Sequence, residues 1–149
     1  MPIIAIAYTS EVTPGLTRSK MEALVLDAAR FNANAGVTGV LLFDGSRFLQ
    51  YIEGPQDGLD VALSRIVQAR SHRHFVELRR GRIEQRAFPY WGMREITVDA
   101  LCLSGIAGSD WHDFVLGRDG QGGVEAEGAS VPTAMEQLGR VVSTHVSIA

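Results

Sequence analysis

The sequence predicts an α+β domain of the ferredoxin-like type, a β-α-β-β-α-β-β sheet with two helices on one face, plus a short helical C-terminal extension. The first observation is the order of the patterns, because short β-branched apolar runs alternate with two stretches of helical apolar spacing. The second is a hairpin turn, Asp44-Gly45, that joins two of the apolar runs directly. The third is size, since 149 residues suffice for one domain with its own core.

The first strand and the first helix are separated by a turn. Residues Ile3 to Thr9 are apolar and β-branched, which predicts a buried strand. The segment Glu11 to Leu16 contains a Pro-Gly turn signal, and Thr17 after it is a suitable helix N-cap. We expect the helix to end near Gly36. Its apolar face consists of Met21, Leu24, Val25, Ala28 and Phe31.

Four further apolar runs predict the remaining strands. They are Val37 to Phe43, Arg47 to Glu53, Phe75 to Arg82 and Trp91 to Val98. Gly54-Pro55 ends the third strand, and a second helix is expected to follow it to about Arg70. The apolar stripe of that helix is Leu59, Ala62, Leu63, Ile66 and Val67.

The chain changes character after residue 98, so we divide it into a domain at 1–98 and an extension at 99–149. A short helix is expected from Ser109 to Leu116, and the five glycines between Gly117 and Gly128 predict a mobile loop. Thr133 and Glu136 have capping-box spacing, which predicts a helix over 133–146. Because this helix has an apolar face, we expect it to fold back on the exposed sheet face or to form a protein interface.

Composition excludes several classes of function. The 14 Lys and Arg against 17 Asp and Glu give a net charge of −3, which argues against a general nucleic-acid binder. The single Cys102 cannot form an internal disulfide, and neither a signal peptide nor a membrane span is recognisable, so we expect a cytoplasmic protein. His72 and His74 lack a third ligand at suitable spacing, so no metal site is predicted. The arginines at 79, 80, 82 and 86 are expected to form a solvated strand edge.

Three polar side chains fall where the predicted core should be. Strand alternation places Tyr8 on the face of Ile6, and Gln50 on the face of Ile52. Asn32, near the end of the first helix, can face the same layer. These groups either satisfy one another and the backbone, or line the site of a flat ligand with a polar edge between helices and sheet. Convergence of three such groups favours the ligand.

The residues around these positions form a recognisable set of motifs. They are Ala-Arg-Phe-Asn at 29–32, Gly-Val-Thr-Gly at 36–39, Phe-Leu-Gln at 48–50, Glu-Gly at 53–54 and Trp-Gly-Met at 91–93. Together with Tyr8, this set resembles the signature of BLUF domains, the blue-light sensors that use FAD. The resemblance covers residues 1–98. It implies a ferredoxin-like fold that holds the isoalloxazine ring between the two helices and the sheet.

The resemblance also implies roles for individual residues. Tyr8 and Gln50 would form the hydrogen-bonded pair beside the flavin, and Asn32 would bond the polar edge of the ring. Leu24 and Ile66 would lie on the two ring faces. Arg30 and Arg65 would contact the polar edge or phosphate groups, and Trp91 and Met93, placed on the fifth strand, would shift during signalling.

Two positions depart from the family pattern, and both bear on the hydrogen bonds around the ring. Phe31, counted here among the flavin contacts, stands where a polar residue is usual. Ala69 stands where an acidic residue is common. The pair of Tyr8 and Gln50 is unaffected by either departure.

The residue types suit photochemistry. An excited flavin is a strong one-electron oxidant, and the Tyr8 phenol can give an electron while its proton passes along a hydrogen bond. Gln50 presents both a donor and an acceptor, which its amide can exchange by rotation or tautomerisation. We therefore expect a blue-light photoreceptor, not an enzyme, that forms a homo-oligomer and signals to another protein.

Two other functions are less well supported by the sequence. A small ferredoxin-like hydrolase of the acyl-phosphatase kind needs a positioned Arg in the loop after the first strand. Here that loop, Ser10 to Gly15, has an acid and no base. A redox flavoenzyme is not favoured either, because the chain contains no G-x-G-x-x-G fingerprint.

Overall fold

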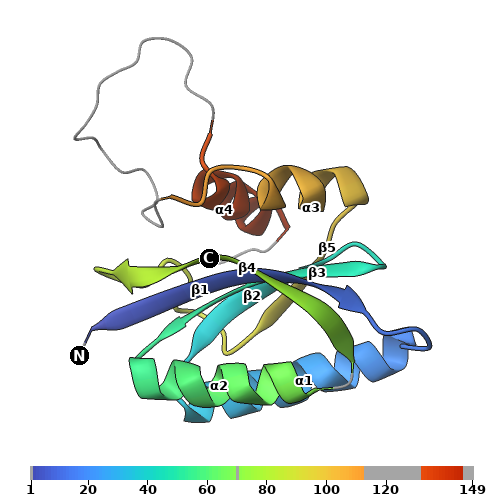
Figure 1. The fold of residues 1–149 in the computed structure, drawn as a ribbon, viewed down its shortest axis with the longest axis horizontal. Coiled ribbons are helices and arrows are strands. Elements are labelled where there is room, and N and C mark those ends of the chain that lie inside the picture. Colours follow the sequence, from blue (N-terminus) through green and yellow to red (C-terminus); the bar gives the residue numbers. More distant parts are fainter. Residues whose placement is uncertain (1, 70, 113–131, 146–149) are drawn as a thin grey trace.

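A mixed five-stranded sheet with helices on both faces forms the centre of the molecule (Figure 1). The computed structural model describes residues 2–69, 71–112 and 132–145. In chain order the elements are β1 (Ile3–Val12), α1 (Arg18–Asn34), β2 (Thr38–Phe43), β3 (Arg47–Gly54), α2 (Gln56–Gln68), β4 (His72–Ile83), β5 (Arg94–Thr97), α3 (Ala100–Ala107) and α4 (Ala134–His145). This order confirms the predicted ferredoxin-like α+β fold.

The sheet order is β4-β1-β3-β2-β5. β1 pairs antiparallel with both β3 and β4, β2 pairs antiparallel with β3, and β2 pairs parallel with β5. The two edges are therefore β4 and β5. Because β3 lies at the centre, its residues 48–53 pair with β1 on one side and β2 on the other, and they are buried on both faces.

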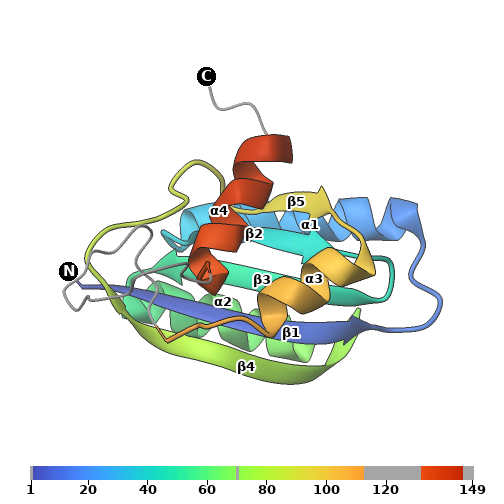
Figure 2. The same cartoon turned by 90° about the horizontal axis from the view of Figure 1, so that it is seen from above.

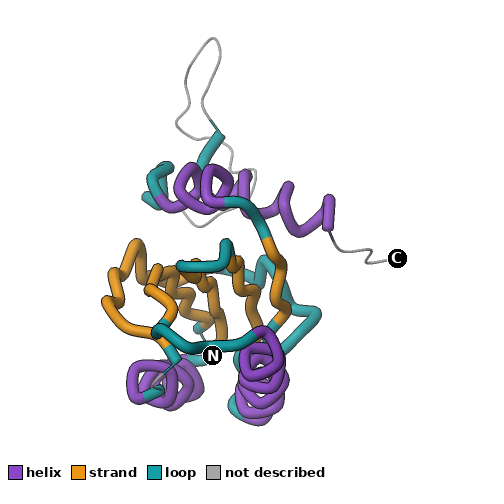
Figure 3. Tube along the Cα trace, turned by 90° about the vertical axis from the view of Figure 1, so that its right-hand side faces the viewer, coloured by secondary structure: helices purple, strands orange, loops and turns teal. Residues whose placement is uncertain are grey.

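Two apolar cores lie on the two faces of the sheet, and Figure 3 shows the three resulting layers. α1 and α2 cover one face, where Phe48 and Ile52 of β3 are buried. α3 and α4 cover the other face, where Leu49 and Tyr51 of the same strand are buried. Strand alternation thus sends neighbouring residues of β3 into different cores.

Local signals set several of the boundaries as expected. The Thr17 hydroxyl accepts a hydrogen bond from the Lys20 amide at 3.1 Å, and α1 begins at the next residue. Thr133 and Glu136 cap α4 reciprocally, with N–H to side-chain oxygen distances of 3.0 and 3.1 Å. These bonds satisfy donors that a helix N-terminus would otherwise leave unpaired.

The helix α4 packs on the sheet face opposite α1 and α2 (Figures 1 and 3). Met135, Leu138 and Val142 are buried there against the core that contains Tyr51. Of the two expectations for this helix, the structure shows the one in which it folds back on the sheet face. Among the described helices, none is both long enough and apolar enough for a membrane span.

Some predicted boundaries are wrong. β1 continues to Val12 and β4 begins at His72, because these two residues pair with each other across the sheet. β5 is shorter than predicted, and Trp91 and Met93 precede it rather than lie on it. α2 ends at Gln68, slightly earlier than expected.

The prediction for the start of the extension is also wrong. A helix, α3, begins after Asp99, whose carboxylate accepts a hydrogen bond from the Cys102 amide at 2.7 Å. The predicted helix from Ser109 is not formed over 109–112, and its remainder lies outside the described residues. The glycine-rich stretch from 117 to 128 lies outside them as well. The helix that follows the sheet is thus α3 at Ala100–Ala107, capped by Asp99, and it was not predicted.

Candidate functional site

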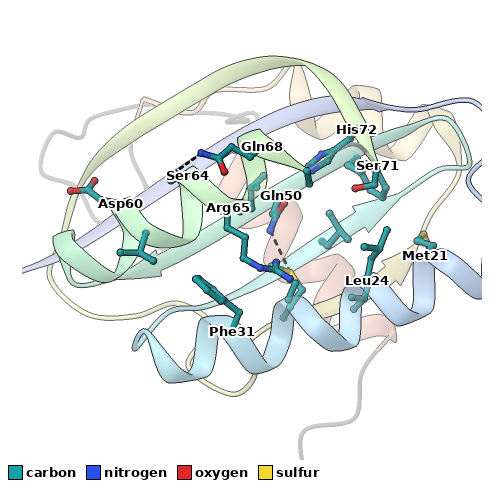
Figure 4. Close-up of a pocket in the computed structure, with 18 residues that line it drawn as sticks. Met21, Leu24, Phe31, Gln50, Asp60, Ser64, Arg65, Gln68, Ser71 and His72 are labelled. Atoms are coloured by element: carbon teal, nitrogen blue, oxygen red, sulfur yellow. Dashed lines mark hydrogen bonds between the residues drawn. The ribbon is translucent and has the colours of Figure 1, made fainter.

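A cavity of about 670 Å³ opens between α1, α2 and the sheet (Figure 4). Its lining comes from α1, β2, β3, α2, the start of β4 and the residue before β5. The residues are Met21, Leu24, Val25, Ala28, Phe31, Leu41, Phe48, Gln50, Asp60, Val61, Ser64, Arg65, Ile66, Gln68, Ala69, Ser71, His72 and Met93. The volume lies within the range of small-molecule and cofactor sites.

A chain of polar contacts forms the floor of this cavity. The register of β1 and β3 places Tyr8 opposite Gln50, and the Tyr8 hydroxyl donates a hydrogen bond to Gln50 Oε1. Gln50 Nε2 points to Met93 Sδ at 3.8 Å, the dashed line near Gln50 in Figure 4. Because a thioether is a weak acceptor, the amide keeps donor capacity for a polar atom in the cavity.

Tyr8 lies behind Gln50 and is almost fully buried, with 2% of its surface exposed. Burial raises the pKa of its phenol well above the ordinary value. The phenol is therefore neutral at physiological pH and acts as a hydrogen-bond donor. Its hydroxyl is hydrogen-bonded to Gln50, which lines the cavity, so the Gln50 amide links Tyr8 to the cavity floor.

The cavity walls are apolar and come from the two helices. Leu24 and Phe31 of α1 lie across from Ile66 of α2. At the mouth, Arg65 reaches from α2 towards Phe31 of α1, whose ring centroid lies 4.9 Å from the guanidinium (Figure 4). The guanidinium also lies 2.5 Å from Asp27 of α1. A flat ring would meet hydrocarbon on both faces and a cation at the opening.

The structure brings together most of the predicted site residues. Six of them line the cavity: Leu24, Phe31, Gln50, Arg65, Ile66 and Met93. Asn32 is buried beside it and donates a hydrogen bond to the Gly92 carbonyl at 3.0 Å. This bond holds the backbone next to Met93.

Two predicted site residues lie elsewhere. Arg30 is exposed and lines a separate surface groove on α1 with Lys20 and Leu26. Trp91 is half-buried and packs against the core on the α3 and α4 face, with the Arg94 guanidinium 5.8 Å from its ring centroid. Of the pair at 91 and 93, Met93 therefore faces the cavity and Trp91 does not. On regular extended backbone, two residues separated by one position share a side, so the opposite placement of Trp91 and Met93 comes from the bend at Gly92.

Sequence reasoning missed His72, which lines the cavity from the start of β4. Its Nδ1 lies 2.8 Å from the Ser10 hydroxyl, and its ring packs against Phe75 with centroids 4.7 Å apart. Burial lowers the pKa of the imidazole to about 4, so it is neutral near pH 7. The signal in the sequence was its position shortly after the second helix, where the edge strand begins beside the cavity.

Among the described residues, no cluster suitable for a metal ion is found.

Comparison with known proteins identifies the part of the chain that contains the cavity. The family model "Sensors of blue-light using FAD", BLUF, matches residues 3–94. A photoactivated adenylate cyclase subunit beta of Euglena longa is 30% identical over 100 residues, which is 66% of this chain and 12% of the relative. The blue light- and temperature-regulated antirepressor BluF of Escherichia coli is 36% identical over 76 residues, 51% of this chain and 19% of the relative. The chain thus spans less than a fifth of either relative.

A solved structure agrees with these sequence matches. The dark-state structure of BlrB, a BLUF protein, superposes with a TM-score of 0.60 at 29% identity. The match covers 64% of this chain and 73% of the BlrB chain. The described cavity and its polar floor fall within the matched family region.

Proposed function

The chain belongs to the BLUF family of blue-light sensors that use FAD, and we propose that its Tyr8–Gln50 pair converts light into a rearranged hydrogen-bond network that is passed to a partner protein. BLUF domains bind FAD. The family assignment replaces the alternative of a small ferredoxin-like hydrolase.

The cavity suits the isoalloxazine ring of FAD. A flat aromatic system needs two apolar walls, which Leu24 and Ile66 supply from α1 and α2. Its polar edge needs a donor on the floor, which the Gln50 amide supplies. Asn32 is proposed for the polar edge, Phe31 for a ring contact, and Arg65 at the mouth for a phosphate group. Arg30, on the outer groove of α1, is proposed only for the part of FAD that extends beyond the mouth.

The chemistry of the switch depends on two side chains. Bound FAD would absorb the blue photon and act, when excited, as a one-electron oxidant for which a neutral phenol is a suitable donor. The Tyr8 proton lies in the hydrogen bond to Gln50 Oε1 and can move along it. Gln50 can then exchange the direction of its donor and acceptor groups by rotation or tautomerisation. The low polarity of the surroundings strengthens each of these bonds.

The buried hydrogen bond between Tyr8 and Gln50 at the cavity floor is the observation that carries this proposal. The test is absorption spectroscopy of the FAD-loaded protein before, during and after blue illumination. We expect a small red shift that reverses in the dark. An unchanged spectrum of fully loaded protein would contradict the proposal.

Signal output is proposed to involve the extension. We propose residues 1–98 as the photosensor and 99–149 as the segment that passes the signal to a downstream protein. The BluF relative is described as an antirepressor, which supports a protein as the partner. A homo-oligomer and a cytoplasmic location complete the proposal, and size-exclusion chromatography of dark and illuminated protein tests the association state.

A further inference from the structure

The segment from 86 to 93 is the larger part of the connection between β4 and β5, the two edges of the sheet (Figure 2). It has little regular structure of its own, so side-chain and backbone contacts with other elements hold it in place. One end contacts β3 and the start of β2. The other end, at Trp91 to Met93, contacts α1 and the cavity floor.

The first end is held by the carboxylate of Glu53, a β3 residue with 0% of its surface exposed. Oε1 accepts hydrogen bonds from the Ala87 amide at 2.9 Å and the Tyr51 hydroxyl at 2.8 Å. Oε2 accepts one from the Phe88 amide at 2.7 Å. An ionised carboxylate only accepts hydrogen bonds, so two consecutive N–H groups fix the direction of the segment at this point.

Arg86 adds contacts at the same end. Its guanidinium donates to the Gly36 carbonyl at 2.6 Å, to the Thr38 hydroxyl at 2.8 Å and to the backbone carbonyl of Glu53 at 3.2 Å. The expectation that Arg86 belongs to a solvated strand edge is therefore wrong. Its side chain joins the segment to β2 and β3.

The second end is packed closely. Asn32 donates to the Gly92 carbonyl, and the Gly39 amide donates to the Trp91 carbonyl at 3.1 Å. A Cβ at Gly92 would lie 2.2 Å from the Ala29 carbonyl oxygen, so only glycine fits. Met93 then places its sulfur against Gln50 Nε2. The hydrogen bonds and the close approach at Gly92 thus fix the backbone directly before Met93.

We propose that Glu53 is a positioning residue for the light switch, acting through the segment 86–93 to hold Met93 against the Gln50 amide. Gln50 and Glu53 stand three residues apart on β3 and point to opposite faces of the sheet. The central strand is a rigid spacer between the two attachment points. This inference rests on the proposed function. It assigns a role to the glutamate of the Glu-Gly motif at 53–54.

The test compares Glu53→Gln with Tyr51→Phe. Glu53→Gln keeps the side-chain volume but turns one acceptor into an N–H donor that faces a backbone N–H. Tyr51→Phe removes one donor to the same carboxylate and leaves both backbone hydrogen bonds in place. The two variants thus separate the anchoring of the segment from the general satisfaction of the buried carboxylate.

The first readout is the methyl spectrum of ¹³C-methyl methionine in FAD-loaded protein kept in the dark. The chain has four methionines, and loss of one signal in Met93→Leu assigns Met93. We expect Glu53→Gln to move the Met93 signal by more than its linewidth and to leave Met21 and Met135 in place. Tyr51→Phe should leave all three unchanged. An unchanged Met93 signal in a folded Glu53→Gln protein would overturn the proposal.

The second readout is the rate of dark recovery after illumination. With Met93 displaced, Gln50 loses a partner that orients its amide, so recovery in Glu53→Gln should be faster by about tenfold, equivalent to about 1.4 kcal/mol in the barrier. A recovery rate equal to the parent's would overturn the proposal. If Glu53→Gln does not fold, Arg86→Gln serves as the second variant, because it loosens the same end of the segment. It should shift the Met93 signal in the same way. An unchanged Met93 signal in Arg86→Gln would overturn the proposal.

The methyl spectrum also separates this inference from the proposed function. Absence of any light response in the parent protein would contradict the photoreceptor proposal, whatever the methionine signals do. In that case, a shifted Met93 signal in Glu53→Gln would still show that Glu53 determines the position of Met93 beside the Gln50 amide.

Discussion

The two faces of the sheet use the same strands for different purposes. On the α1 and α2 face, the side chains leave a cavity of about 670 Å³ with Gln50 on its floor. On the α3 and α4 face, Tyr51 of the same strand lies in a core filled by Met135 and Leu138. One face is built to receive a ligand, and the other is completed by the chain itself.

The buried polar groups on the two faces also differ, because one can change its hydrogen bonds and the other cannot. Gln50 has a neutral amide whose nitrogen meets only a weak acceptor, so its hydrogen bonding can be reversed. Glu53 accepts three hydrogen bonds in good geometry, so its position is fixed. A switch needs the first kind of group and a support needs the second, and strand alternation supplies both within four residues.

Among the variants that test this difference between the faces, Gln50→Leu is expected to have the largest effect, which is on the light response. The leucine fills a similar volume, so the fold and FAD binding should survive with a loss of about 1–3 kcal/mol in the free energy of unfolding. The light-induced absorption shift should disappear, because no group that can reverse its hydrogen bonding remains between Tyr8 and the ring. A normal reversible shift in this variant would place the switch elsewhere.

Tyr8→Phe is the matched variant for the other half of the pair. It should abolish the shift as well, because the electron and proton donor is missing. FAD absorption in the dark checks that the cofactor is still bound in both variants.

The packed face is tested next, by Leu138→Ala. Leu138 is fully buried at 0% exposure in the core beneath α4, so the substitution should lower the free energy of unfolding by about 2–5 kcal/mol. Leu24→Ala on the cavity wall, at 39% exposure, should cost less stability and weaken FAD binding more. Denaturant titration and FAD titration of both variants measure this. Equal stability losses would break the contrast between the faces.

A pH dependence is expected from His72 at the cavity edge. Its folded pKa of about 4 lies below the unfolded value of about 6.5, so the unfolded chain binds the proton first as the pH falls. Stability of the flavin-free protein should therefore be lost from about pH 6.5 down to about pH 4, by about 1–2 kcal/mol since the ring is only partly buried. His72→Gln should flatten this part of the profile. Identical profiles in thermal melts of the two proteins would contradict the assignment.

The smallest effect on stability is expected at the mouth of the cavity. Arg65→Gln breaks an exposed pair with Asp27, which should change the free energy of unfolding by less than about 1 kcal/mol. Affinity for FAD should fall more than affinity for riboflavin, because riboflavin lacks the phosphates. Arg18→Gln, in an exposed pair with Glu22 elsewhere, is the control and should change neither. Equal losses for both flavins would remove Arg65 from the phosphate contacts.

Local patterns predicted much of the fold and part of the site. Thr17, Asp44-Gly45 and the Thr133–Glu136 box each act within four residues, so their effects could be recognised without a structure. The alternation of side chains along strands also predicted that Tyr8 and Gln50 point to the side of the sheet covered by the first two helices. α3 was not found, although Asp99 caps it in the same way, because its eight residues are too few to show a periodic apolar stripe.

The amino-acid sequence by itself determined the order of the five strands and the first two helices, the core beneath those helices, and the family, because these follow from periodicity and motif spacing. Only the tertiary structure decided that Met93 rather than Trp91 faces the cavity, that His72 lines it and that Glu53 holds the connecting segment. Each of these depends on contacts between residues more than 30 positions apart or on the backbone direction in an irregular segment. Periodic patterns carry no information about either, since they describe one element at a time.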